Sequence, residues 1–156
     1  MEKIYNIFVD GSVNPQKKIG FGSYLFCDDI NHHDTKKIKS KFFEDTSSTK
    51  LELQTFIWAL KDIDLKCKFV VYTDCQNILS LLNRKEKLQS NNYKTSTNKL
   101  VKNKQLYEEF FLLCEKYDFE VIKVKGHKKS CLKDNIEKIF TFVDRYSRKK
   151  LREYLA

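Results

Sequence analysis

Two short apolar segments of this sequence each end at an aspartate, and the pattern between them constrains the fold. Apolar and aromatic residues crowd positions 4–9 and 68–73, which are followed by Asp10 and Asp74. Within positions 47–63, apolar residues recur every three or four places, as they do on one face of a helix. Because a strand, a helix and a second strand in this order form a parallel crossover, both aspartates are expected at the same edge of one sheet.

Each of the acidic residues near these boundaries also has an ordinary structural explanation. Asp10 begins an Asp-Gly dipeptide that is typical of a turn, and Asp74 stands where it would cap the helix expected after it. Glu52 follows Thr49 by three residues, which is the spacing of a capping box in a helix that is capped by Ser48 or Thr49. From the residues alone, these roles stay open beside a functional cluster.

The remaining segments complete a single α/β domain over residues 1–156. A chain of this length buries roughly 68–70% of its unfolded surface around one core, and no repeat or Pro-rich linker divides it. A polar turn at 12–18 joins the first strand to a second as a hairpin, and a third strand lies at the edge of the sheet. The patterns predict strands at 19–28, 36–44 and 118–127, and helices at 75–84, 105–117 and 134–155.

Two features with the composition of ligand sites have simpler interpretations. Gly20 and Gly22 are too few and wrongly spaced for a phosphate-binding GxGxxG loop, so we interpret them as strand positions where another backbone comes close. The segment DDINHHDT at 28–35 contains two histidines and three aspartates, yet such residues are common in the connection between two strands. We therefore expect a hairpin connection there rather than a metal site.

The composition favours a polyanionic partner. The chain has 30 Lys and Arg residues against 21 Asp and Glu, which gives a net charge of +9. Nucleic acid is favoured over a membrane, because no uncharged apolar run approaches about 18 residues and the N-terminus lacks a signal-peptide pattern. The cysteines form no CxxC pair, which indicates reduced thiols and a soluble, cytoplasmic protein. They are Cys27, Cys67, Cys75, Cys114 and Cys131.

One segment holds most of the excess positive charge. Positions 84–104 contain seven basic residues and one acid, and thus carry a net charge of +6. A charge run is usually a solvated face, but this one is polar, separates two helical segments and contains a single aromatic residue, Tyr93. The segment therefore predicts a basic protrusion that binds nucleic acid.

The acidic residues would need cations if they meet at one edge of the sheet. Asp10, Glu52 and Asp74 lie at strand or helix ends, and the last helix can supply Asp144. Two ionised carboxylates ~4 Å apart repel by ~4 kcal/mol at an effective dielectric constant near 20. Ligand sets made only of oxygen select hard ions such as Mg²⁺ or Mn²⁺. Two such ions can activate a water and stabilise the leaving oxygen in a phosphodiester displacement.

Five motifs together resemble the type 1 ribonuclease H pattern. They are IFVDGS, SSTKLEL, VVYTDCQ, VKGH and an aspartate in the last helix, in the same order and over nearly the whole chain. The resemblance implies a ribonuclease H-like fold with a five-stranded mixed sheet, three antiparallel strands and then two parallel ones, flanked by helices. It also implies endonucleolytic cleavage of the RNA strand of RNA–DNA hybrids by two Mg²⁺ ions, for which Mn²⁺ would substitute. The products would carry 5′-phosphate and 3′-hydroxyl ends.

The resemblance also assigns catalytic residues by position. The carboxylates that match the metal ligands of the family are Asp10, Glu52, Asp74 and Asp144. His127 matches the mobile residue that assists proton transfer or product release, a role that suits a neutral imidazole. The interval between His127 and Asp144 is longer than expected for the family, so Asp134 or Glu137 compete for the fourth carboxylate position.

The same resemblance implies two sets of nucleic-acid contacts. Positions that match contacts to the minor groove of the hybrid, where 2′-hydroxyl groups are displayed, are Asn14, Ser48, Thr49 and Gln76. Residues of the protrusion that would grip the DNA-strand side are Tyr93, Lys94, Lys99 and Lys102. The family usually has two amides where Ser48 and Thr49 stand, and tryptophans in the protrusion where Tyr93 is the only large ring. Cys75 replaces the usual serine, as a small buried side chain.

Two other functions remain possible from the sequence. A resolvase-like or transposase-like nuclease uses similar carboxylates on the same fold and would cut branched or plain duplex DNA. A non-catalytic hybrid-binding module would bind through Lys94, Lys99 and Lys102 and would show no metal-dependent turnover. No obligate protein partner is evident, and the expectation is a monomer that binds an RNA–DNA hybrid and no membrane.

Overall fold

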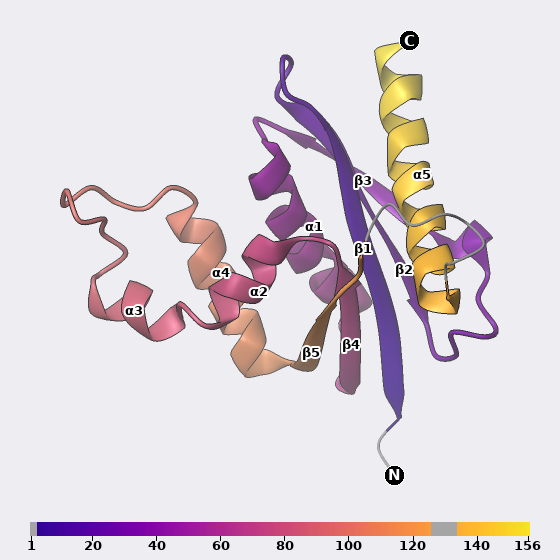
Figure 1. Ribbon diagram of the computed structural model, residues 1–156, viewed down its shortest axis with the longest axis horizontal. Helices are drawn as coiled ribbons and strands as arrows, with labels where there is room; N and C mark the ends of the chain where they lie inside the picture. The colour runs from indigo at the N-terminus through magenta and orange to yellow at the C-terminus, as the bar shows by residue number, and fades with distance from the viewer. Residues whose placement is uncertain (1–2, 126–133) are drawn as a thin grey trace.

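A five-stranded mixed sheet forms the centre of the computed structural model, which describes residues 3–125 and 134–156 (Figure 1). The strand order is β3-β2-β1-β4-β5; β1 pairs antiparallel with β2 and β2 with β3, whereas β1–β4 and β4–β5 are parallel. The strands are β1 (Ile4–Asn14), β2 (Ile19–Cys27), β3 (Lys39–Glu44), β4 (Lys68–Thr73) and β5 (Asp118–Lys123). This is the mixed sheet that the resemblance implied.

Helices cover both faces of the sheet (Figure 1). They are α1 (Ser48–Ile63), α2 (Gln76–Leu82), α3 (Lys85–Ser90), α4 (Lys104–Lys116) and α5 (Asn135–Leu155), with a 3-10 turn at Thr35–Lys37. The alternation of β1 divides the core, because Ile7 and Val9 pack in the cluster that includes α1 and α4, whereas Phe8 packs in the cluster that includes α5. No helix in the described part of the chain has the length and apolarity needed to cross a membrane.

The Asp-Gly dipeptide at the predicted end of the first strand is not a turn. β1 continues through it, with Asp10 opposite Ser23 and Gly11 opposite Gly22 of β2, and the strand ends only at Asn14. The turn that follows is closed by the Asn14 side chain, whose Oδ1 accepts a hydrogen bond from the Lys17 amide at 3.0 Å. Pairing along the whole hairpin overrides the local turn preference, because it satisfies the backbone groups on both sides of the dipeptide.

The glycines of β2 allow α1 to approach the hairpin closely. A Cβ atom on Gly20 would lie 2.7 Å from Leu51 Cδ2 and 2.8 Å from the Ser12 carbonyl oxygen. A Cβ atom on Gly22 would lie 2.8 Å from Cγ2 of Thr55. The expected approach of another backbone is present at Gly20, where it is the Ser12 carbonyl group, whereas the neighbour of Gly22 is a side chain of α1.

The helix caps differ from the predicted ones. Ser47 is the N-cap of α1 and accepts a hydrogen bond from the Lys50 amide at 3.3 Å, so the predicted N-cap at Ser48 or Thr49 lies one or two residues too late. Glu52 therefore lies beyond the first turn, outside the capping-box position. The N-cap of α2 is Cys75, which makes no side-chain cap, so Asp74 is not the cap of that helix. Both corrections remove the ordinary explanations for these two acids.

The basic segment 84–104 lies at the opposite end of the molecule from α5 (Figure 1). It contains α3 and a loop in which Lys94 pairs with Leu100 as an isolated antiparallel bridge. The Val101 amide donates to the Tyr93 carbonyl at 2.7 Å, which closes the loop at its base. The segment thus forms an ordered projection beside the sheet rather than an extension of it.

Candidate active site

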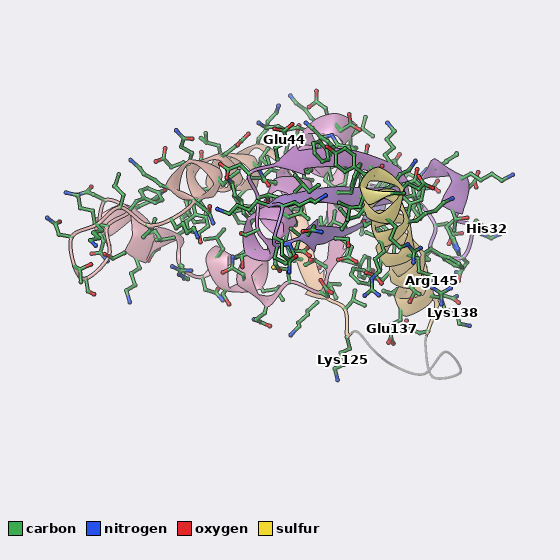
Figure 2. All side chains as sticks on the ribbon, turned by 90° about the horizontal axis from the view of Figure 1, so that it is seen from above. His32, Glu44, Lys125, Glu137, Lys138 and Arg145 are labelled. Atoms are coloured by element: carbon green, nitrogen blue, oxygen red, sulfur yellow. The ribbon has the colours of Figure 1, made fainter. Side chains whose placement is uncertain are left out.

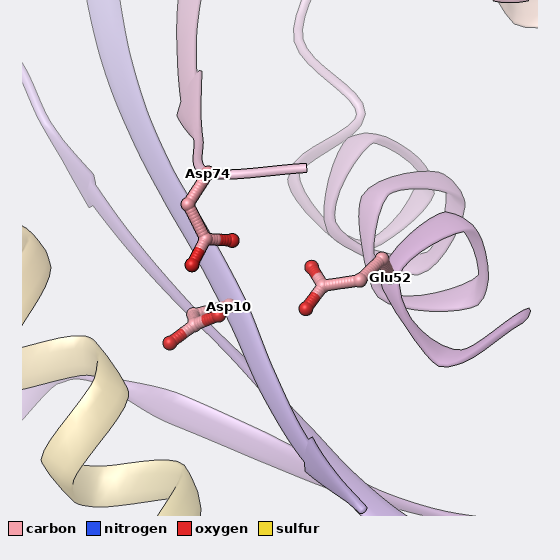
Figure 3. A group of neighbouring side chains, drawn as sticks. All are labelled: Asp10, Glu52 and Asp74. Carbon is pink, nitrogen blue, oxygen red and sulfur yellow. The ribbon is translucent and has the colours of Figure 1, made fainter. Parts of the chain in front are cut away.

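Three acidic side chains from three separate elements meet beside the sheet (Figure 3). Asp10 comes from β1, Glu52 from α1 and Asp74 from the residue after β4. One carboxylate oxygen from each lies within 4.8 Å of the other two. Within the described ranges, no other group of three or more potential ligands satisfies this geometry.

The strand register explains why the two aspartates are neighbours. Phe8 of β1 pairs with Tyr72 of β4, and each aspartate follows its paired residue by two positions. The parallel crossover predicted from the sequence therefore delivers both side chains to the same edge. Glu52 reaches this edge because its neighbour Leu51 packs against the glycines of the hairpin, which fixes α1 beside β1.

Asp144 of α5 is the fourth acid at the cluster. Side-chain hydrogen bonding with Asp144 and the charge of Asp144 raise the pKa of Asp10, and the same charge raises the pKa of Glu52. Arg148, one turn later, donates from Nε to Asp144 Oδ1 at 3.2 Å. Asp134 instead caps α5 by accepting the Glu137 amide at 2.8 Å. Asp144 rather than Asp134 is thus the candidate whose charge acts on the other acids. Glu137 is buried in the first turn of α5.

The electrostatics of the cluster oppose its ionisation. Asp10 is only 3% exposed, and burial, repulsion from Glu52 and the hydrogen bond to Asp144 together raise its pKa far above the ordinary carboxyl range. Burial and the charges of Asp74 and Asp144 also raise the pKa of Glu52. The Oε2 atom of Glu52 is buried and has no hydrogen-bond partner among the described residues. A divalent cation with oxygen ligands would relieve both the repulsion and the unsatisfied oxygen.

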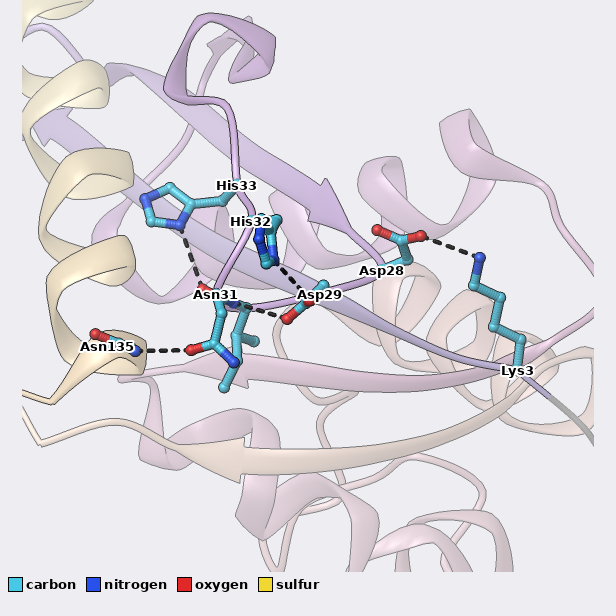
Figure 4. A network of polar contacts seen from close by, with 8 residues as sticks. Lys3, Asp28, Asp29, Asn31, His32, His33 and Asn135 are labelled. Atoms are coloured by element: carbon cyan, nitrogen blue, oxygen red, sulfur yellow. Dashed lines mark hydrogen bonds and ion pairs between the residues drawn. The ribbon is translucent and has the colours of Figure 1, made fainter.

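The histidine-rich loop connects β2 to β3, the position that the sequence predicted for it. Its polar side chains bond to one another and to their neighbours (Figure 4). The contacts are Lys3–Asp28 at 3.0 Å, His32–Asp29 at 2.9 Å, His33 to the Ile30 carbonyl at 3.3 Å and Asn135–Asn31 at 2.9 Å. The hydrogen bond between Asn135 and Asn31 connects the loop to the first residue of α5 and so helps to position that helix.

Several residues with predicted nucleic-acid contacts flank the carboxylates. Ser48 and Thr49 are exposed in the first turn of α1, the helix that carries Glu52, and Gln76 is exposed at the start of α2, two residues after Asp74. Asn14 is half-buried at the end of β1, four residues beyond Asp10. His127 lies outside the described residues.

The predicted protrusion residues fall into two groups. The lysines are exposed on the loop after α3: Lys94, Lys99 and Lys102. Tyr93 is half-buried, packs against the core on the α1 side and has Lys104 Nζ 5.8 Å from its ring centroid. Its ring therefore supports the loop rather than projecting from it.

Comparisons with known proteins agree with this geometry. A family model for RNase H matches residues 2–148. The protein belongs to the ribonuclease H family. Ribonuclease H of Caldicellulosiruptor saccharolyticus is 33% identical over 135 residues, which cover 85% of this chain and 90% of that protein. Ribonuclease H of Acetivibrio thermocellus is 34% identical over 145 residues, which cover 90% of this chain and 94% of that protein.

Among solved structures, a foamy viral protease-reverse transcriptase in complex with dsDNA has the same fold. It superposes with a TM-score of 0.63 over 92% of each chain, at 13% sequence identity. Membership of the ribonuclease H family makes this protein an endoribonuclease, as the sequence motifs predicted.

Sequence reasoning missed some residues that shape this ribonuclease H site. Arg148 contacts Asp144, and the spacing of four residues within a helix was a signal that could have identified the pair. Arg84 and Lys87 line a depression of about 630 Å³ in the protrusion together with Lys94. They belong to the basic run, but which cations share one surface depends on the loop conformation, which the sequence pattern does not specify.

Proposed function

We propose that this ribonuclease H cleaves the RNA strand of RNA–DNA hybrids endonucleolytically, with two divalent metal ions, and leaves 5′-phosphate and 3′-hydroxyl ends. The observation that carries the proposal is the convergence of Asp10, Glu52 and Asp74 at one edge of the sheet, with Asp144 beside them. Carboxylates this close together, two of them with raised pKa values, destabilise the fold, and bound cations would offset that cost.

The proposed metal ligands are these same four carboxylates, and the proposed ions are Mg²⁺, with Mn²⁺ as a substitute. When bound, the ions supply Lewis-acid activation of a water and neutralise charge on the leaving oxygen. The protein's part is to hold its carboxylates in place before the substrate arrives. Asp10 is central, because Glu52, Asp74 and Asp144 all act on it. Arg148 restrains Asp144 through their hydrogen bond.

Substrate recognition is proposed to use both groups of flanking residues. Ser48, Thr49 and Gln76 are exposed next to the carboxylates, where short hydroxyl and amide side chains can bond to 2′-hydroxyl groups in the wide minor groove of a hybrid. Asn14 belongs to the same proposed set. The lysines of the protrusion are proposed to bind phosphates of the DNA strand, with His127 assisting proton transfer or product release.

The direct test is the variant Asp74→Asn with a labelled hybrid, matched duplex RNA and matched duplex DNA, each in Mg²⁺, Mn²⁺ or chelator. Asp74 is exposed, so the variant is expected to fold, to retain hybrid binding and to lose cleavage by at least about 100-fold. The matched control is Asp118→Asn, an exposed aspartate at the opposite end of the parallel strands, which should cut like the wild type. Near wild-type cleavage by Asp74→Asn would refute the site assignment, and cutting of the DNA duplex alone would indicate a different nuclease.

We further propose that the chain is one domain that works as a monomer inside the cell. All four acids come from one chain, so the site needs no second copy. The four described cysteines are free, as is usual in a reducing compartment. Light scattering during gel filtration tests the monomer directly, since a dimer would double the measured mass.

A further inference from the structure

The C-terminal half of α5 carries a second concentration of positive charge. Positions 145–152 contain five basic residues and no acid, in addition to the net charge of +6 in positions 84–104. The net charges of these two segments add up to more than the +9 of the whole chain, so the remaining residues together have a small negative net charge. The positive charge is therefore concentrated in two segments and is not spread evenly over the chain.

Four of these cations lie on one face of the helix. Arg145, Arg148, Lys149 and Arg152 are spaced three and four residues apart, and all four are exposed; they are named here the α5 basic face. The opposite face is buried against the sheet through residues that include Ser147. Figure 2 labels Arg145 on this helix.

Few acids neutralise this face. Arg148 bonds to Asp144 through Nε at 3.2 Å, which leaves its two terminal amino groups for another acceptor. Lys149 lies 3.9 Å from Glu153, a long contact between exposed groups that contributes little. Arg145 and Arg152 make no ion pair with any residue in the described part of the chain.

The α5 basic face begins where the carboxylate cluster ends. Asp144 belongs to the cluster and Arg145 is the next residue, whereas Arg152 lies about 12 Å beyond Asp144 along the helix axis at 1.5 Å per residue. That length corresponds to roughly three or four nucleotide steps of 3.4 Å. Figure 1 shows α5 on one side of β1 and β4 and the basic segment 84–104 on the other. A duplex placed on the carboxylates would therefore have positive charge on both sides.

We infer that the α5 basic face binds phosphate groups of the nucleic-acid duplex beyond the cleavage position, on the side away from the protrusion. This inference rests on the proposed function and extends it. It gives the enzyme two sets of contacts to the nucleic-acid backbone, one on each side of the carboxylates. Arginine suits this role, since its planar guanidinium group pairs with phosphate through two hydrogen bonds. Contacts to phosphates carry no sequence information, so they would position the duplex without selecting a base.

The test is the double variant Arg145→Gln/Arg152→Gln in the full chain, compared with Lys66→Gln/Lys116→Gln. Both pairs remove two charges, but Lys66 and Lys116 precede β4 and β5, at the opposite edge of the sheet. Affinity for a hybrid and for a DNA duplex of about 20 base pairs is measured in chelator between about 50 and 300 mM salt. Thermal unfolding of each variant confirms that it is folded.

The α5 variant is expected to bind both duplexes roughly 3- to 10-fold more weakly near 0.1 M salt, with a log–log salt slope smaller by about one to two units. The control should change affinity by less than about twofold. Equal effects of the two double variants, or an unchanged slope, would overturn the inference. Cleavage by the wild-type protein is scored separately, so failure of the nuclease proposal and failure of this surface are distinguishable.

Discussion

Gly22 of β2 lies directly beneath Thr55 of α1. A Cβ atom at Gly22 would come within 2.8 Å of Thr55 Cγ2 and 2.9 Å of Thr55 Cβ, and closer still to its hydroxyl. The Thr55 hydroxyl is itself held by the Leu51 carbonyl at 2.7 Å, so it cannot move away freely. Because Glu52 lies on the same helix, this contact sets the distance between one metal-binding candidate and the sheet.

The first prediction concerns this contact. Gly22→Ala should displace α1, lower the free energy of unfolding by about 1–3 kcal/mol and reduce cleavage, because Glu52 moves with the helix. Chemical denaturation and single-turnover cleavage measure the two effects. The double variant Gly22→Ala/Thr55→Ala should be less destabilised than the sum of the single variants. Strict additivity would show that the two positions do not press on each other.

The second prediction concerns pH. The pKa values of Asp10 and Glu52 are raised in the folded protein, so the folded state holds more protons than the unfolded state above about pH 4. Without metal, the contribution of these two groups to stability should therefore be fully present below about pH 4 and should fall as the pH rises towards the raised pKa values. Melting temperatures in chelator from pH 5 to 8 measure this, and Mg²⁺ should recover more stability at pH 8 than at pH 5. If Asp10→Asn leaves the pH dependence unchanged, the cluster is not its source.

The third prediction separates the candidates for the fourth carboxylate. Asp144→Asn should weaken metal-dependent cleavage by about 10- to 100-fold, most strongly at low Mg²⁺. Asp134→Asn should have little effect, because asparagine caps a helix about as well as aspartate. A cleavage titration with Mg²⁺ compares the two variants. The reverse order of effects would move the fourth ligand from Asp144 to Asp134.

The fourth prediction concerns the protrusion. Replacing Lys94, Lys99 and Lys102 with glutamine should reduce the salt slope of hybrid binding by up to about one unit for each phosphate that the variant no longer neutralises. Filter binding over a salt series measures it, with Lys66→Gln as the exposed control. An unchanged slope would mean that these lysines face solvent without touching the duplex.

The parts of the site that follow from strand order were predictable from the sequence. Asp10 and Asp74 each follow an apolar run that forms a strand. Because the two strands are joined by a helical crossover and pair in parallel, both aspartates are expected at the same edge of the sheet. Glu52 was harder, because local statistics favoured a capping box. Only the observed cap at Ser47 removes that alternative.

The parts that depend on long-range packing were not predictable from pattern alone. The alternative of a turn at Asp10 is ruled out because β2 pairs along β1 through Asp10 and Gly11, a tertiary effect that outweighs a dipeptide preference. Asp10 and Asp144 interact although they are far apart in sequence. The choice of Asp144 as the fourth acid depended on the family resemblance, because periodicity alone did not distinguish it from Asp134 or Glu137. The inward packing of Tyr93 likewise depends on the loop conformation, in which Asn92 and Tyr93 have positive φ angles. The sequence pattern did not predict those angles.

The most direct measurement of the central claim is anomalous diffraction from Mn²⁺ in crystals of the protein with a non-cleavable hybrid. If the acids bind the metal ions, anomalous peaks are expected about 2.1 Å from carboxylate oxygens of Asp10, Glu52 and Asp74, next to a phosphate of the RNA strand. Peaks elsewhere on the protein, or a hybrid bound with its RNA phosphates away from these three acids, would contradict it.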